Sequence, residues 1–446
     1  MKKCITCGKM NKTTIITFLL LSAVILFFLL NDLIFGFNYS NIFYEMSIVN
    51  SFWVDKSKRH RLIEASFNYL GILLFGTILY LLQKFVIRNR NYNKVKTLKK
   101  KLIYYKSKRL SRMNIYYLLI LIIIWVVGEN LIILFGELFK DLDFWFLELI
   151  FLSVMLNFFF GVPIYKHHLF SMILIISICS TLKIINIILS FTYNDDSELY
   201  VMFWYMTIIG LIINLILIGN KTLYITGIKW FIDLKFVSHT ILLIIYGAFG
   251  AVFSIIFCIA ATYIDCNKLY NEDIVGNICF IKSNENERIY YLDNFFIYFK
   301  QLKSEKNKII LIIFGVITFF AFKYCYILTI KRYNPVYVLF TNPIVYFIEK
   351  ILLMINTLAK KKTLFLESET QGKSFYKKVN FFLDIAGDIS FIIGFLIYLE
   401  VIVINCYGLN HNVKDNIEHR GIDNYRNIEF VDETGEFSLI IDDEST

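Results

Sequence analysis

The chain has 446 residues, of which 57% are hydrophobic, 17% aromatic and only 18% charged, and its formal net charge is +10. Soluble globular domains carry about 25% charged residues. The deficit extends along the whole length, and the longest polar stretch is the tail after about residue 407. The composition therefore leaves no room for a separate soluble catalytic domain of ordinary size.

Ten apolar segments organise the chain, and nearly all of them reach the ~20 residues that a helix needs to cross a bilayer. They predict an all-α, polytopic membrane protein with ten transmembrane helices. Two sets of five favour a five-plus-five inverted repeat, an architecture found in secondary transporters. The halves would be 1–192 and 193–407, followed by an acidic cytoplasmic tail at 408–446. The segments span about 13–36, 67–87, 115–136, 144–164, 169–192, 199–219, 237–264, 308–330, 334–357 and 380–406.

Loop charges predict the topology. Between Arg88 and Arg112 there are eleven Lys or Arg and no acidic residue, which is typical of a cytoplasmic face and of attraction to anionic lipid. A nucleic-acid site is not expected so close to two membrane helices. The other short loops alternate in charge and place both termini in the cytoplasm. The loop 358–379 disagrees, because it carries six lysines on the side that the alternation places outside.

The N-terminus has four lysines before its first apolar run, but no A-x-A-like cleavage site follows, so we predict a retained helix. Cys4-x-x-Cys7 has the spacing of half a zinc site, and because no convincing second pair occurs, we interpret both as ordinary thiols. Cys266 and Cys279 share a loop and could pair in an oxidising compartment. Residues 289–303 predict a helix that lies at the membrane interface or packs on the protein.

One region has a characteristic order of elements. Residues 115–176 contain a helix, a short acidic turn and a second helix ending in NFFFGVPIYKHH (157–168), and a further helix follows at once. This order resembles the third to fifth helices of the drug/metabolite transporter superfamily. The turn in that superfamily typically carries a glutamate, which this sequence lacks.

Two later regions carry the same resemblance. Residues 214–221, followed by 235–250 with Tyr246-Gly247 near its end, resemble the sixth and seventh helices, especially in the nucleotide-sugar and sugar-phosphate branch. Residues 392–398 resemble the tenth helix. The resemblance covers roughly 13–407 and implies an inverted repeat, a central solute site and alternating access. Its relatives carry nucleotide sugars, sugar phosphates, amino acids and other solutes, and no motif selects among them.

Two ionisable residues lie near the middle of apolar segments, where charges are costly and usually face a cavity or a partner. Glu129 lies in the third segment and Lys323 in the eighth. A five-plus-five repeat makes these segments equivalent, so the pair would meet across the pseudo-symmetry axis. We predict that Glu129 and Lys323 bind the solute or each other. The alternative is a structural ion pair between helices.

Other polar residues inside the segments are weaker candidates. Lys183, deep in the fifth segment, could hold a phosphate or carboxylate of the solute, or extend its ammonium to the interface. We expect Glu148 at the interface, and Asp384 and Asp388 at a solvated helix start. For Trp125, one turn from Glu129, packing is favoured over contact with a substrate.

Three classes of function follow. The first is an integral-membrane secondary transporter or exchanger of a small polar solute, in an endomembrane of the Golgi or ER type or in the plasma membrane. The second is a membrane-embedded transferase, whose site would be Lys166, His167 and His168. The third is a non-transporting scaffold or receptor.

No P-loop occurs, so no nucleotide-driven pump is expected. We expect no enzyme activity, no cofactor and no metal. The partners expected are a small-molecule solute and the lipid bilayer, and no nucleic acid is expected. The sequence is also compatible with a homo-oligomer.

Overall fold

A computed structural model of the chain describes the helices and strands and some of their connections. Described are residues 5–7, 12–35, 61–90, 112–135, 145–193, 204–235, 237–263, 281–284, 287–291, 293–304, 307–332, 335–339, 341, 343–345, 347–348, 350–351, 371–405 and 408–409. The predictions for Cys4, for Cys266 and Cys279, for most of the loops 88–112 and 358–379, and for nearly all of the tail lie outside these residues.

The described chain is predominantly helical, and each of the ten apolar segments contains a helix. By length and composition, six of the described helices can cross a membrane: Leu62–Phe85, Lys166–Asn186, Leu211–Asp233, His239–Tyr263, Ile312–Arg332 and Val379–Tyr398. The other apolar helical stretches are shorter: Leu19–Leu30, Ile115–Leu131, Glu148–Phe160 and Val336–Val345. A multi-pass helical protein is therefore supported, while ten spans and an inverted repeat stay predictions.

The chain divides into two compact units, each built from several stretches of sequence. Unit 1 contains 1–22, 146–201 and 328–446, and unit 2 contains 23–145 and 202–327. Helices α1 (Lys12–Phe35) and α14 (Asn307–Arg332) cross the division. Neither unit coincides with a half of the sequence, so the division of the chain at residue 192 also stays a prediction.

Unit 2 is built around α4 (Arg61–Arg90) and α11 (His239–Tyr263), which make its most extensive helix contact. Glycines of α11 allow this approach: a Cβ at Gly247 would lie 2.7 Å from the backbone nitrogen of Leu73. Small residues permit close helix packing in lipid, where the hydrophobic effect does not drive association. The absence of a side chain at Gly247 therefore lets the two helices lie close together. Helices α6 (Arg112–Phe135) and α10 (Trp204–Asp233) pack against each other, and α6 also packs on α11.

A short helix of unit 2 packs on the protein. The hairpin of β2 (Ile281–Asn284) and β3 (Glu287–Tyr291) leads into α13 (Phe295–Ser304). Asn294 caps α13, since its Oδ1 accepts from the backbone N–H groups of the second and third helical residues at 3.0 and 3.1 Å. Tyr298 joins a buried cluster with Leu62 and Cys258. Burial raises the pKa of Tyr298 well above its usual value, and nearby carboxylates act in the same direction. The expected helix is thus present from Phe295 and packs on the protein, whereas residues 289–291 belong to β3.

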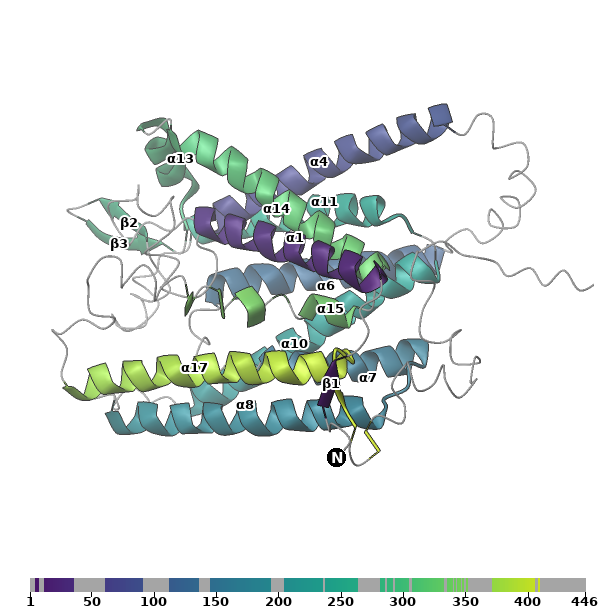
Figure 1. The fold of residues 1–446 in the computed structure, drawn as a ribbon. Helices are drawn as coiled ribbons and strands as arrows, with labels where there is room; N and C mark the ends of the chain where they lie inside the picture. Colours follow the sequence, from purple (N-terminus) through teal and green to yellow (C-terminus); the bar gives the residue numbers. More distant parts are fainter. Residues whose placement is uncertain are drawn as a thin grey trace, which may run out of the picture. The chain divides into compact units, whose positions relative to one another are not determined.

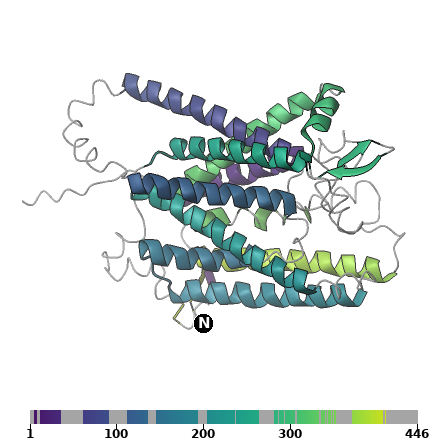
Figure 2. The same ribbon diagram turned by 180° about the vertical axis from the view of Figure 1, so that it is seen from behind.

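Unit 1 is organised by an antiparallel pair of long helices, α8 (Lys166–Tyr193) and α17 (Gln371–Tyr398), which lie side by side in both views (Figures 1 and 2). The Ser171 hydroxyl donates to the Gly394 carbonyl at 2.5 Å, and Cys179 Sγ lies 3.8 Å from the Gly387 carbonyl. These contacts place the beginning of α8 beside the end of α17.

Smaller elements complete unit 1. After the 3₁₀ turn η2 (Trp145–Leu147), the helix α7 (Glu148–Phe160) packs on α15 (Val336–Leu339). The strand β1 (Ile5–Cys7) pairs antiparallel with β4 (Ile402–Ile404), with Cys7 opposite Ile402.

Two boundary predictions were wrong. Helix α10 continues through the predicted loop 220–236 as far as Asp233, because its polar residues are absorbed within the helix, as in the Lys229–Asp233 ion pair at 3.0 Å. Helix α17 begins at Gln371 rather than near residue 380, so Asp388 is buried instead of solvated, whereas Asp384 is exposed. Glu148 is the first residue of α7 and is buried within the protein, and its expected place at the membrane interface stays a prediction.

Candidate functional site

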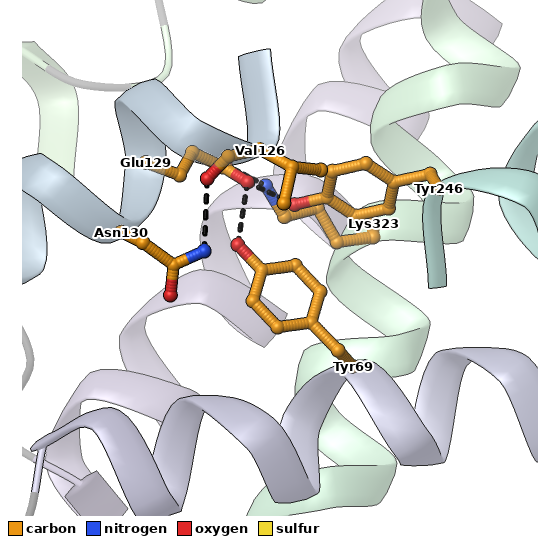
Figure 3. A network of polar contacts seen from close by, with 6 residues as sticks. All are labelled: Tyr69, Val126, Glu129, Asn130, Tyr246 and Lys323. Carbon is orange, nitrogen blue, oxygen red and sulfur yellow. Dashed lines mark hydrogen bonds and ion pairs between the residues drawn. The ribbon is translucent and has the colours of Figure 1, made fainter. Parts of the chain in front are cut away.

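The Glu129 carboxylate is the centre of a polar network in unit 2 (Figure 3). Its Oε1 accepts from Lys323 Nζ at 2.8 Å, and its Oε2 accepts from the hydroxyl of Tyr69 at 2.8 Å and from that of Tyr246. The four residues come from α6, α14, α4 and α11, respectively. Four apolar helices therefore converge on one carboxylate, and a negative charge inside them is met by one cation and two phenols.

The Lys323 ammonium has aromatic neighbours. Its Nζ lies 5.1 to 6.0 Å from the ring centroids of Tyr246, Phe319, Phe322 and Tyr326. At such separations the electron-rich faces of aromatic rings attract a cation. An ammonium has three N–H donors, and among the described residues Nζ has one hydrogen-bond partner, Glu129. Lys323 thus keeps donor capacity while its charge is compensated.

The ion pair is enclosed but not sealed. The side chains of Lys323 and Glu129 keep 15% and 16% of their surface accessible. Moving two charges out of water costs several kcal/mol for each ion, and mutual attraction often fails to offset that cost. Hydrophobic residues of similar size would serve stability as well or better. The network is therefore a poor device for stability alone, and part of its charged surface stays accessible.

Packing around the network holds the tyrosines in place. A Cβ at Gly250 would lie 2.1 Å from the Tyr69 ring, so this ring occupies space that only glycine leaves free. The rings of Tyr69 and Tyr246 meet edge to face, with centroids 5.4 Å apart. Next to Glu129, Asn130 is fully buried, and its Oδ1 accepts from the Ser254 hydroxyl of α11 at 2.8 Å. These contacts fix the helices that present the four polar side chains.

The structure brings together two of the three predicted solute-binding residues, Glu129 and Lys323, as an ion pair. The third, Lys183, lies half-buried on α8 in unit 1 and makes no salt bridge within the described part of the chain. Trp125 is buried and stacks on Tyr224 with ring centroids 4.8 Å apart, in line with the packing role favoured for it. That Glu129, Lys323 or Lys183 binds a solute stays a prediction.

Tyr69 and Tyr246 had not been identified from the sequence. The chain contains 29 tyrosines, and most of the apolar segments carry one or more, so a phenol inside a segment gives no signal. Gly247 and Gly250, which pack on Leu73 and Tyr69, are equally unremarkable because glycine is frequent in membrane helices. A second charged pair was also missed: Lys350 Nζ lies 2.6 Å from Asp388 Oδ2 in unit 1.

Comparison with known proteins gives no relative. No protein-family model matches the chain, and no curated protein and no solved structure matches it. The class of protein that the fold supports is therefore a helical, multi-pass membrane protein, and its activity has to be argued from its own residues.

Proposed function

We propose that the chain is a secondary transporter or exchanger that moves a small polar solute across a membrane by alternating access. The observation that carries the proposal is the Glu129–Lys323 ion pair inside apolar helices, with Tyr69 and Tyr246 on the same carboxylate. Ionisable residues within membrane helices commonly belong to substrate or ion pathways, because their burial is costly.

The network suggests how a solute would be held. An anionic group, such as a phosphate or carboxylate, would compete with Glu129 for the Lys323 ammonium and use its remaining N–H donors. Glu129 would keep the two phenolic hydrogen bonds, so it would not be left without partners. Before a solute binds, Lys323 and Glu129 neutralise each other. The proposed solute therefore carries an anionic group, as nucleotide sugars and sugar phosphates do.

Alternating access also needs helices that can shift against one another. Helices α4 and α11, which carry the two tyrosines, approach at Gly247 and Gly250. Contacts through small residues allow backbones to lie close with few interlocking side chains. A rearrangement of this pair would move both phenols relative to Glu129 on α6, and so couple the site to a conformational change.

Uptake into proteoliposomes tests the proposal. The purified full-length chain would be screened with radiolabelled nucleotide sugars, sugar phosphates and amino acids. For the solute that is taken up, Glu129→Gln and Lys323→Met should each lower the initial rate by about ten- to a hundredfold, because a hydrogen bond to a charged group contributes about 1.5–3 kcal/mol.

Lys300→Met is the control, since Lys300 is exposed on α13 and is not part of this network. Its uptake should equal that of the unchanged chain. Monodisperse size-exclusion profiles would show that each variant is folded. Unchanged uptake in both Glu129→Gln and Lys323→Met would end the assignment of this site. Absence of uptake for every solute class, with the chain folded, would favour a scaffold or receptor.

A further inference from the structure

Three side chains of types that ligate metals meet in unit 1, where α8 begins and α17 has just ended. They are His167 and His168, the second and third residues of α8, and Glu400, two residues beyond the end of α17. One ligand atom from each of the three lies within 4.8 Å of the other two. The sequence had drawn attention to the histidines, but Glu400 is more than 200 residues away from them in the chain.

His167 is the centre of this cluster. It is 4% exposed, and its Nε2 lies 3.2 Å from Glu400 Oε1. The orientation of the two groups does not satisfy hydrogen-bond geometry, and neither ring nitrogen has a hydrogen-bond partner among the described residues. A buried imidazole without a partner is costly. Two ligands of a tetrahedral zinc ion, each about 2.0–2.2 Å from it, lie about 3.4 Å apart, which is close to the separation observed.

The backbone at Glu400 supports a special role for this residue. Glu400 has φ +60°, the only positive φ of a non-glycine residue in the described part of the chain. Its N–H donates to the Ile397 carbonyl, and the next N–H donates to the Leu396 carbonyl, at 3.1 and 3.0 Å. This is the Schellman pattern, whose left-handed position is usually a glycine. A glutamate there carries backbone strain, and strained residues cluster at functional sites.

The second histidine is held by a backbone group of the turn before α8. The Tyr165 N–H donates to His168 Nδ1 at 3.3 Å. Ligation through Nε2 requires the proton on Nδ1, so binding of a metal there would replace this long bond. The His167 and His168 rings lie 4.0 Å apart.

A pocket leads to the cluster and connects it with a sequence motif. His167 and Glu400 line this pocket together with Ile402 of β4. In the strand pair, Ile402 is the register partner of Cys7 in β1. Cys7 closes the Cys4-x-x-Cys7 motif, which has the spacing of half a zinc site. The pairing thus places the backbone of Cys7 next to the strand that lines the pocket.

We propose that His167, His168 and Glu400 bind a divalent transition-metal ion of the zinc class. Two imidazoles and one carboxylate are a donor set that zinc uses, and an ion bound by three protein ligands has a fourth position open. Zinc would bridge the close but poorly oriented His167 and Glu400 side chains and satisfy the buried imidazole. The site lies in unit 1 and does not depend on the proposed transport function, which rests on unit 2.

Metal-dependent melting tests the site. The full-length chain in detergent, freed of metal with a chelator, would be titrated with Zn²⁺ while its thermal unfolding is followed. Binding to the folded state alone raises the melting temperature as the metal concentration increases. His167→Gln, His168→Gln and Glu400→Gln should each shift the Zn²⁺ concentration for half of this effect upward by at least about tenfold. His239→Gln, on α11 of unit 2, is the matched control and should respond like the unchanged chain.

Glu400→Gly separates a ligand from a structural glutamate. Glycine suits the left-handed backbone, so this variant should melt at a higher temperature without metal and should lose the response to Zn²⁺. A variant that melts higher yet responds to Zn²⁺ like the unchanged chain would overturn the proposal. So would a chain whose melting does not change with Zn²⁺.

Cobalt substitution identifies the donor atoms. Co²⁺ bound to the unchanged chain should show visible absorption bands as intense as those of tetrahedral Co²⁺. Glu400→Gly should lose these bands. A thiolate-to-cobalt charge-transfer band that disappears in the Cys4→Ser, Cys7→Ser double variant would assign the fourth position to a cysteine; its absence would assign that position to water. Retention of all metal binding in His168→Gln, with loss in the double variant, would place the metal on the cysteines and reject the site.

Discussion

Each compact unit contains a buried ion pair between helical residues, and the two pairs differ in their surroundings. In unit 2, Glu129 accepts from Lys323 and from two tyrosines, and about a sixth of its side-chain surface is accessible. In unit 1, Asp388 accepts from Lys350 at 2.6 Å and is only 4% exposed, while Lys350 is 16% exposed. The Glu129 carboxylate is therefore well supplied with donors and accessible, whereas the Asp388 carboxylate is enclosed.

This difference separates two uses of a buried charge. A carboxylate that keeps phenolic donors can release its lysine to another anion and still have partners. An enclosed carboxylate that depends on its lysine is better suited to join two helical segments, since loss of the partner would leave an uncompensated charge. We therefore propose solute binding for Glu129–Lys323 and a structural role for Asp388–Lys350. Their variants should divide accordingly between uptake and stability.

The largest expected effect is on stability in unit 1. Lys350→Met leaves the buried Asp388 carboxylate without its cation, and breaking a buried pair in this way costs about 3–5 kcal/mol. Lys323→Met should cost less, because Glu129 keeps Tyr69 and Tyr246. Thermal unfolding of both variants in the same detergent measures the difference. A greater loss for Lys323→Met would contradict the comparison.

The double variant Lys350→Met, Asp388→Leu sharpens this result. Replacing both members of a buried pair with apolar residues is often neutral or stabilising. It should therefore recover most of the stability that Lys350→Met loses, and its uptake should match that of the unchanged chain. Uptake that falls with Lys350→Met and is not recovered by the double variant would give unit 1 a direct part in transport.

The next effect comes from glycine positions that support the two regions. Gly250→Ala would push a methyl group against the Tyr69 ring, 2.1 Å from the new Cβ. Overpacking of this kind costs about 1–3 kcal/mol, and here it also displaces a donor to Glu129, so uptake should fall as well. Gly394→Ala, whose Cβ would lie 2.4 Å from Ile175 Cγ1 in unit 1, should lower stability by a similar amount and preserve uptake per folded molecule.

Gly219→Ala provides the control for both changes. No atom lies within 4 Å of a Cβ at this position, and it is within α10. Alanine should therefore raise helix stability by about 0.5–1 kcal/mol through its better propensity, with uptake unchanged. Equal uptake in Gly250→Ala and Gly219→Ala would show that the position of Tyr69 does not matter for the solute.

The sequence predicted the helical regions well, because the required apolar length is a local property. It located Glu129 and Lys323 for the same reason, since a charge within an apolar run is visible without any knowledge of packing. Their meeting was inferred from repeat symmetry, and the ion pair is present although the symmetry itself stays untested. The solute-binding roles of Glu129, Lys323 and Lys183 also stay predictions.

What hydropathy could not show is where a helix begins when its first turns are polar. The lysines between residues 373 and 378 were assigned to a loop, yet they lie in α17, which brings Asp388 into the interior. Partners distant in sequence were equally hidden. Nothing local to His167 indicates Glu400, because the contact depends on α8 and α17 running antiparallel and on the turn that follows α17.

The smallest effects should come from single hydroxyl groups. Tyr246→Phe removes one donor to the Glu129 carboxylate and leaves Lys323 and Tyr69 in place. Uptake should fall by about tenfold, because the lower end of the range for hydrogen bonds to charged groups, about 1.5 kcal/mol, corresponds to about that factor. Tyr398→Phe in unit 1 removes a 3.0 Å contact with the Ser153 hydroxyl, a neutral pair whose loss costs about 0.5–1.5 kcal/mol of stability. Initial uptake rates and melting curves are measured for both variants. They decide whether the Tyr246 hydroxyl affects uptake through its hydrogen bond to the charged Glu129 or whether both hydroxyls affect only packing. If Tyr246→Phe and Tyr398→Phe changed uptake equally, the tyrosines on Glu129 would have no special part in holding the solute.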